Sequence, residues 1–268
     1  MMGKNHQGTY YQLYYKENAP IVVLIHGLGL TNEIWQWIIP VLSRNYTVLT
    51  YDLLGHGQSK DPQANPNLSD LSNQLLALMS HLKINLAGII GFSLGGMIAR
   101  KFAQDHREKV SALCLLNTPH RRTEKQKTNI QARVENAQKY GPASTVEAAL
   151  ERWFTQSFRL AEPQTMRLVR DWVMANKPEV YHQIYRILVD GVEEVVAPNP
   201  SLSCPTMIIT ADEDYGNGPE MAQEISNEIR RSKIIILKGL RHMALVESPN
   251  AVNGPILAFF QKVILKNS

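Results

Sequence analysis

The stretch Gly91-Phe92-Ser93-Leu94-Gly95 has the pattern G-x-S-x-G and decides how the rest of this chain is interpreted. It follows the apolar run Ala87 to Ile90, which predicts a buried strand, and precedes Met97 to Asp105, which has helical periodicity. A serine on a sharp strand-to-helix turn is typical of a nucleophile elbow, which exposes the hydroxyl. The flanking glycines suit such a turn, because strand and helix approach too closely for a Cβ atom. We therefore predict that Ser93 is a nucleophile, with an ordinary glycine-rich turn as the alternative.

The segments on either side of this stretch alternate between strand and helix patterns. Apolar runs of strand length are separated by segments with helical periodicity, both before and after Ser93. Such alternation predicts the α/β class, with a mostly parallel, twisted sheet flanked by helices on both faces. The predicted strands span 8–15, 21–26, 46–51, 87–90, 112–116, 206–210 and 233–237, and the predicted helices span 32–42, 68–82, 97–105, 219–229 and 250–266.

A long mid-chain segment departs from this alternation. Residues 119–200 contain several amphipathic helix patterns and no convincing strand, which predicts a helical cap inserted into a core formed by 1–118 and 201–268. Aromatic residues in this segment are expected either to wall an apolar pocket or to pack the cap onto the core. They are Trp153, Phe154, Phe158, Trp172 and Tyr185.

A serine hydroxyl is a weak nucleophile at neutral pH and needs a nearby base, usually a histidine held by a carboxylate. Of the eight histidines, His242 follows the last predicted strand, where a loop at the C-terminal edge of the sheet can reach Ser93. We predict that His242 is the base, the alternative being a loop histidine bonded to backbone. Five others are expected at the surface, namely His6, His81, His106, His120 and His182.

The carboxylate is expected in a loop between the serine and the histidine in chain order. Three acids, Asp212, Glu213 and Asp214, follow the strand predicted over 206–210. The first residues after a strand tend to turn away before the loop reaches inward, which favours Asp214. Asp212 and Glu213 are the alternatives at this point.

Acyl transfer also needs donors for the developing oxyanion, and backbone N–H groups suit this task because they are fixed before the reaction begins. One predicted donor is the amide of Leu94, directly after the serine. The second is the amide of Leu28, in the turn His26-Gly27-Leu28-Gly29. We expect His26 itself to be a structural hydrogen-bonding group, because a second base has no task. This chemistry requires no metal and no organic cofactor.

Four motifs, in order along nearly the whole chain, resemble those of the α/β-hydrolase superfamily. They are His26 to Gly29, which resembles its H-G-x-G oxyanion loop; Asp52 to Ser59, which resembles its D-x-x-G-H-G-x-S turn; Gly91 to Gly96, which resembles its nucleophile elbow; and His242 to Pro249, which is similar to its histidine segment ending in E-x-P.

The resemblance implies the α/β-hydrolase fold and places Asp214 on the family's acid position, in a G-x-x-D pattern in which Ala211 replaces glycine. The core and cap look like the group that holds 3-oxoadipate enol-lactonases and small carboxylesterases. What this implies is a serine hydrolase that cleaves a carboxylic ester or lactone through an acyl-enzyme on Ser93. The alternatives are a C–C bond hydrolase, thioesterase or lyase of the same fold, and a non-catalytic small-molecule receptor.

Composition excludes several other classes of protein. Lys and Arg (28) exceed Asp and Glu (24) by only 4, and the densest basic run, Arg121 to Lys127, is interrupted by acid and holds no aromatic residue. We therefore expect this run to be a solvated helix face, and we expect no nucleic-acid partner. No apolar run approaches the roughly 20 residues of a membrane-spanning helix. Met1 to His6 contains no apolar core of a signal peptide, so we expect a cytoplasmic protein whose partner is a small-molecule ester or lactone.

Overall fold

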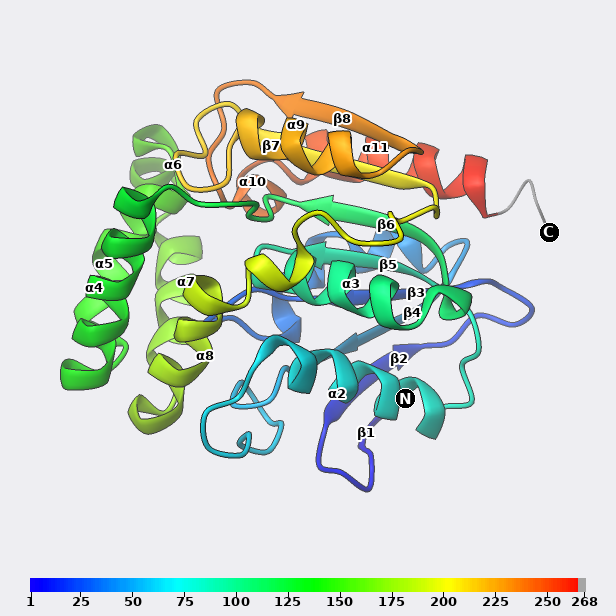
Figure 1. Cartoon of the computed structure of the whole chain (residues 1–268), viewed down its shortest axis with the longest axis horizontal. Helices are drawn as coiled ribbons and strands as arrows, with labels where there is room; N and C mark the ends of the chain where they lie inside the picture. Colours follow the sequence, from blue (N-terminus) through cyan, green and yellow to red (C-terminus); the bar gives the residue numbers. More distant parts are fainter. Residues whose placement is uncertain (265–268) are drawn as a thin grey trace.

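A computed structural model describes residues 1–264 and contains an eight-stranded sheet in these residues (Figure 1). The strand order is β1-β2-β4-β3-β5-β6-β7-β8. Strand β2 pairs antiparallel with β1 and β4, and all the other pairings are parallel. This confirms the predicted mostly parallel sheet. The strands are β1 (Met2–Lys4), β2 (Tyr10–Tyr14), β3 (Ile21–Ile25), β4 (Thr47–Tyr51), β5 (Ala87–Phe92), β6 (Val110–Leu116), β7 (Thr206–Ala211) and β8 (Ser232–Leu237).

Helices cover both faces of the sheet, which explains why the central strands are apolar throughout rather than alternating with polar residues. Helices α2, α3 and α9 pack on one face, and α1 and α11 pack on the other (Figure 1). Strands β4 and β5 are consequently buried along their whole length. The helices of the core are α1 (Ile39–Leu42), α2 (Leu68–His81), α3 (Leu94–Asp105), α9 (Pro219–Glu228), α10 (Ala244–Glu247) and α11 (Pro249–Val263), with 3-10 turns η1 (Asn32–Trp37), η2 (Arg107–Lys109) and η3 (Glu193–Val195).

Two predicted elements differ from the structure, and one strand has no predicted counterpart. The single helix predicted over 32–42 is split into η1 and α1, because Pro40 has no N–H and fits an α-helix only in its first turn. Strand β1 was not predicted; it is an edge strand of three residues, Met2–Lys4, which is too short to show an apolar alternation. The final helix was predicted to run to 266, and α11 ends at Val263; residues 265–268 lie outside the described part of the chain.

A helical insertion lies between β6 and β7, which confirms the predicted mid-chain cap helices. These helices gather at the end of the sheet towards which the parallel strands point (Figure 1). They therefore stand over the loops in which the sequence places its candidate residues. The division into 1–118, 119–200 and 201–268 stays a prediction. The cap helices are α4 (Glu124–Tyr140), α5 (Ala143–Trp153), α6 (Gln156–Ala161), α7 (Pro163–Met174) and α8 (Pro178–Asp190).

The chain changes direction across the sheet at β3. From β3 it moves to β4 on one side, and it then crosses back to β5 on the other side. Loops that leave two neighbouring parallel strands in opposite directions open a crevice at their C-terminal ends, where ligands bind in open α/β sheets. The loops after β3 and β5 carry the glycine turn at His26 and the serine turn at Ser93.

Candidate active site

Ser93 lies on a strained turn between β5 and α3. Its φ is +54°, a left-handed value that is uncommon for a residue other than glycine. The turn is held because the Ser93 amide donates to Leu116 O at 2.9 Å. Glycine is required at position 95 because strand β3, the neighbour of β5 in the sheet, lies very close. A Cβ atom at Gly95 would lie 2.0 Å from Ile25 O. The elbow thus depends on backbone contacts that only glycine permits.

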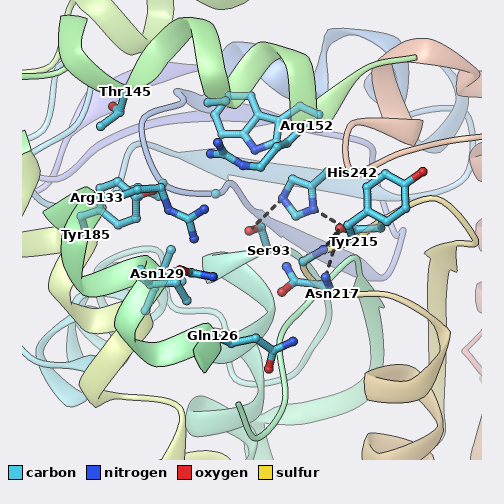
Figure 2. Close-up of a pocket in the computed structure, with 18 of the residues that line it drawn as sticks. Ser93, Gln126, Asn129, Arg133, Thr145, Arg152, Tyr185, Tyr215, Asn217 and His242 are labelled. Atoms are coloured by element: carbon cyan, nitrogen blue, oxygen red, sulfur yellow. Dashed lines mark hydrogen bonds and ion pairs between the residues drawn. The ribbon is translucent and has the colours of Figure 1, made fainter. Parts of the chain in front are cut away.

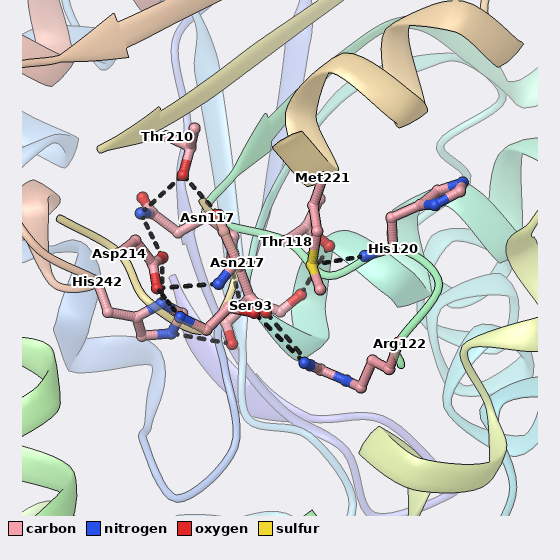
Figure 3. Close-up of polar contacts among 11 residues, drawn as sticks. Ser93, Asn117, Thr118, His120, Arg122, Thr210, Asp214, Asn217, Met221 and His242 are labelled. Carbon is pink, nitrogen blue, oxygen red and sulfur yellow. Dashed lines mark hydrogen bonds and ion pairs between the residues drawn. The ribbon is translucent and has the colours of Figure 1, made fainter. Parts of the chain in front are cut away.

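Ser93, His242 and Asp214 form one chain of hydrogen bonds, of which Figure 2 labels Ser93 and His242 and Figure 3 labels all three residues. His242 Nε2 lies 3.1 Å from Ser93 Oγ, and His242 Nδ1 lies 2.8 Å from Asp214 Oδ2. All three residues are at least nine-tenths buried, with exposed fractions of 8%, 8% and 5%. Distances of this size allow proton transfer from the serine to the histidine, with the carboxylate fixing the orientation of the ring. Their catalytic roles stay a prediction.

The three candidate acids have different partners. Asp214 Oδ1 accepts from the amides of Gly216 and Asn217 at 3.1 and 3.0 Å, and Oδ2 also accepts from Asn117 Nδ2 at 2.9 Å (Figure 3). Burial raises the pKa of Asp214, but the charge and hydrogen bond of His242, with the bonds from Asn117 and Asn217, lower it below its usual value. Asp214 therefore faces His242 as a carboxylate.

The other two acids serve the neighbouring loops. Asp212 Oδ1 accepts from Gly239 N at 2.8 Å, which fastens the loop after β8. Glu213 pairs with Arg241 at 3.3 Å. In the described part of the chain neither of them contacts His242.

The two predicted oxyanion donors, the amides of Leu94 and Leu28, belong to two different turns near Ser93. The Leu94 side chain is buried in the core, and its amide is the first of α3, so it has no acceptor within the helix. Leu28 lines the cavity over Ser93. Among residues 1–264, neither amide donates a hydrogen bond to the protein. Both N–H groups are free to donate to an oxyanion, and their role stays a prediction.

Two buried histidines hold the glycine turn that contains Leu28. His26 Nδ1 donates to Gly27 O at 2.8 Å, and its Nε2 accepts from Leu53 N at 3.0 Å. His56 Nε2 accepts from Gly29 N at 2.9 Å. Burial lowers the pKa of His26 to about 4, and burial followed by the charge of His26 lowers that of His56 to about 3. Both rings are neutral near pH 7. Both ring nitrogens of His26 are bonded to backbone groups, which agrees with the structural role that the sequence predicts.

The cavity over Ser93 has a volume of about 200 Å³. It lies between the core loops and helices α4, α5 and α8 of the cap (Figure 2). Of the five aromatic residues considered from the sequence, Trp153 and Tyr185 line it. Phe154 and Phe158 instead stack on each other, with ring centroids 5.3 Å apart. The remaining one, Trp172, packs edge-on against Trp37 and donates to Glu33.

The cap is bonded to three loops that surround Ser93, namely the acid loop, the histidine loop and the glycine turn. Arg122 donates to Gly216 O at 3.3 Å and to Asn217 Oδ1 at 3.2 Å in the acid loop. Met243 N, next to His242, donates to Trp153 O at 2.9 Å. Asn176 Nδ2 donates to Gly29 O at 3.0 Å in the glycine turn. The cap therefore positions these loops as well as covering them.

Two surface predictions from the sequence are wrong. His120 is buried between Glu224 and Glu228, at 2.7 and 2.8 Å, because the chain leaving β6 passes under α9 before the cap begins. Arg122, within the basic run predicted as a solvated face, is only 9% exposed. Arg122 lies before α4, which begins at Glu124. The exposure expected for the polar face of α4 therefore does not apply to Arg122.

Some residues of the site carry no motif in the sequence. Asn117, which donates to Asp214, directly follows β6, and its position at the carboxyl end of a strand is the one signal that could have indicated it. Arg133 and Arg152 line the cavity from two different cap helices. Their convergence depends on how α4 and α5 pack, which their sequence spacing does not disclose.

The model of a protein family described as the alpha/beta hydrolase fold matches residues 20–249. The chain belongs to this family. Two hydrolases from Acinetobacter baylyi are similar to it along most of their length. One is (E)-2-((N-methylformamido)methylene)succinate hydrolase, 27% identical over 91% of this chain and 91% of that protein. The other is 3-oxoadipate enol-lactonase 2, 25% identical over 94% of this chain and 92% of that protein.

A solved structure extends this similarity to three dimensions. The enol-lactonase from Burkholderia xenovorans superposes on this α/β hydrolase with a TM-score of 0.88 and 25% identity, covering 94% of this chain and 96% of that one.

A membrane-spanning helix needs both sufficient length and an apolar character. None of the helices in residues 1–264 meets both requirements.

Proposed function

We propose that this protein is a serine hydrolase that cleaves a carboxylic ester or lactone of a small molecule through an acyl-enzyme on Ser93. The observation that carries the proposal is the chain of hydrogen bonds from Ser93 Oγ through His242 to Asp214, at 3.1 and 2.8 Å, at the base of a cavity. It is supported by the similarity to enol-lactonases at about one quarter identity. We also propose a cytoplasmic location and a mechanism without a cofactor.

The proposed reaction has two acyl-transfer steps. Ser93 Oγ attacks the carbonyl carbon while its proton passes to His242 Nε2, and the carbonyl oxygen becomes an oxyanion that accepts from the amides of Leu28 and Leu94. Collapse of this intermediate breaks the bond to the leaving oxygen, which takes the proton from His242. Water then attacks the acyl-enzyme and gives a proton to His242, which forms a second oxyanion intermediate. Its collapse breaks the bond between the acyl carbon and Ser93 Oγ, and His242 returns the proton to Ser93 Oγ as the acid leaves. Asp214 orients His242 and stabilises its charged form throughout.

The test compares hydrolysis of p-nitrophenyl acetate and butyrate by the wild type and by two variants. We expect Ser93→Ala to lower kcat by a factor on the order of 10⁶. Asp214→Asn should lower it about 10⁴-fold, because the amide holds His242 in the wrong tautomer. A fluorophosphonate probe should label the wild type and not Ser93→Ala.

The matched control is Asp212→Asn, two residues away in the same loop. Its side-chain oxygen can still accept from Gly239 N, so we expect less than about a threefold change in kcat. A large loss in this variant with none in Asp214→Asn would assign the acid to Asp212. If neither the wild type nor Ser93→Ala hydrolyses the esters or is labelled by the probe, the proposal of an ester hydrolase is wrong.

A second candidate is hydrolysis of a C–N bond, which is favoured by the 27% identical relative that acts on an N-methylformamido compound. The same serine, histidine and oxyanion donors serve this reaction, and only the leaving atom differs. Hydrolysis of p-nitroacetanilide at a rate comparable to p-nitrophenyl acetate would favour this candidate.

A further inference from the structure

Three arginines surround the cavity over Ser93. Arg133 comes from α4 and Arg152 from the last turn of α5 (Figure 2), and Arg122 comes from the segment before α4 (Figure 3). Among the described residues that line the cavity, Asp214 is the only acid. Its two oxygens are already occupied by His242, Asn117 and the amides of its own loop. The cavity wall is therefore strongly positive, although the chain as a whole has a net charge of only +4.

None of these arginines has an ion-pair partner in the described part of the chain. In residues 1–264 no carboxylate lies within ion-pair distance of Arg122, Arg133 or Arg152. Arg133 Nε is buried and has no hydrogen-bond acceptor among the described residues. Arg152 uses Nη1 for Ala148 O, one turn back on its own helix, at 2.7 Å. Arg122 differs in that both of its Nη groups donate to neutral oxygens of the acid loop, Gly216 O and Asn217 Oδ1.

The arginines act on one another across the cavity. Burial lowers the pKa of Arg122 to about 10, and the positive charge of Arg133 adds to that effect. The pKa of Arg152 is lowered by the same two causes in the same order. Guanidinium groups that are largely removed from water and repel each other raise the free energy of the protein when no anion is bound. An anion between them removes this cost, and protein interiors rarely keep such charges without a counter-ion.

We propose that Arg133 and Arg152 bind a carboxylate carried by the substrate, so that the preferred substrates are half-esters or lactones of small dicarboxylic acids. This inference rests on the proposed function and specifies its substrate class. Guanidinium groups match carboxylates through two parallel N–H···O bonds, which gives direction as well as affinity. With the distal carboxylate held by the cap, the scissile carbonyl is presented to Ser93.

Two further features of the site fit a small anionic substrate. The volume of about 200 Å³ is below the 300–1,000 Å³ that is common for drug-sized ligands, so the bound acyl group must be short. Gln126 and Asn129 line the cavity from the face of α4 that also carries Arg133, at helical spacing, and add neutral amide donors. The backbone next to Arg152 is fixed, because Trp153 O accepts from Met243 N beside His242.

The test uses two methyl esters of nearly the same shape. Monomethyl succinate carries a distal carboxylate, and methyl levulinate has an acetyl group in its place. For the wild type we expect kcat/KM to be about 10- to 100-fold higher for monomethyl succinate, the range for hydrogen bonds to a charged group. In Arg133→Gln and in Arg152→Gln the ratio of the two kcat/KM values should fall towards one. Arg133→Lys should recover only part of it, since lysine keeps the charge without the paired bonds.

The matched control is Arg186→Gln, which removes an exposed cap arginine from α8 that does not line the cavity. Its ratio should equal that of the wild type. A wild-type ratio near one, or a ratio unchanged in both cavity variants, would overturn the anion site while leaving ester hydrolysis intact.

A binding measurement separates this inference from the proposed function. Calorimetry of the Ser93→Ala protein with succinate needs no turnover, and we expect binding that Arg133→Gln weakens about 10- to 100-fold and that added salt also weakens. Hexane-2,5-dione, the neutral analogue, should not bind measurably at the same concentration. If the Ser93→Ala protein binds succinate although the wild type cleaves no ester, the hydrolase proposal fails and the anion site stands. If succinate binds no better than the dione, the anion site fails.

Discussion

Ser93 occupies a backbone conformation that costs on the order of 1–3 kcal/mol for a residue other than glycine. The surroundings maintain it from both sides of the peptide. The Ser93 amide donates to Leu116 O, and Thr118 Oγ1 donates to Ser93 O at 3.0 Å. The strain keeps the hydroxyl above the carboxyl end of β5, within reach of His242. At this site the local backbone cost is offset by contacts with the neighbouring strand β6 and with Thr118, two residues after its end.

Gly95→Ala tests how far this turn depends on glycine. The added Cβ would lie 2.0 Å from Ile25 O, a backbone atom that cannot move without shifting β3. We expect a loss of at least about 4 kcal/mol in the free energy of unfolding, or failure to fold, as seen from the urea midpoint. Gly3→Ala is the control, because its Cβ would meet Tyr11 at an ordinary 3.4 Å. Equal midpoints for the two variants would contradict the role given to Gly95.

The residue scale also shows where sequence reasoning has a limit. The loop after β7 offers Asp212 and Asp214 with only one residue between them, and chain order does not separate them. In the fold, Asp212 turns towards Gly239 and Asp214 turns towards His242. Which acid faces the histidine depends on the backbone of a loop that closes against Asn117 and Asn217.

At the scale of elements, the cap contributes bonds to loops that lie far from it in the sequence. Asn176, between α7 and α8, holds the glycine turn, and Trp153, at the end of α5, holds the residue after His242. Arg122 holds the acid loop through Gly216 and Asn217. Reactive geometry requires these loops to stay within fractions of an ångström of their positions. The cap is thus part of the positioning of the site.

Arg122→Gln tests the positioning of the acid loop by the cap. Without the bonds to Gly216 and Asn217 the loop gains freedom, so Asp214 should orient His242 less effectively. For p-nitrophenyl butyrate, a neutral ester, we expect kcat to fall about tenfold with less than a twofold change in KM. Arg121→Gln, one residue away and 59% exposed, is the matched control and should leave both constants unchanged. A change confined to KM would instead indicate that Arg122 binds the substrate.

Elements whose identity rests on long apolar runs were predicted well. Strands β3 to β8 and helices α2, α3, α9 and α11 lie within a few residues of their predicted ranges. The element at 32–42 was not, because its apolar periodicity continues through a proline that ends one helical turn and begins another. Periodicity reports which face is buried, and it does not report which hydrogen bonds the backbone makes.

At the scale of the whole molecule, two histidines buried near the crevice between β3 and β5 couple stability to pH. In the unfolded chain each takes up a proton near pH 6.5. In the folded protein His26 does so only at about pH 4 and His56 at about pH 3. Between pH 6.5 and 4 the unfolded chain therefore binds more protons, and stability falls as the pH falls. Asp214, whose pKa is lowered, acts in the same direction but below this window.

We expect the free energy of unfolding to decrease between pH 6.5 and 4 by up to about 1.4 kcal/mol per pH unit for each of these histidines. Urea unfolding at pH 7, 6, 5 and 4.5 measures this slope. His56→Gln, whose side-chain oxygen can still accept from Gly29 N, should reduce the slope by one histidine's share. A urea midpoint that stays constant from pH 7 to 5 would show that the buried rings titrate normally.

The sequence by itself determined the fold class, the helical insertion and the candidates Ser93 and His242. It could do so because apolar runs report burial directly, and because a strand-to-helix turn of this composition has few other conformations. Tertiary structure decided which acid faces His242, that Arg122 supports the acid loop, and that Arg133 and Arg152 meet at one cavity. These relations join residues from different elements, and their distances are set by how helices and loops pack, which no local pattern encodes.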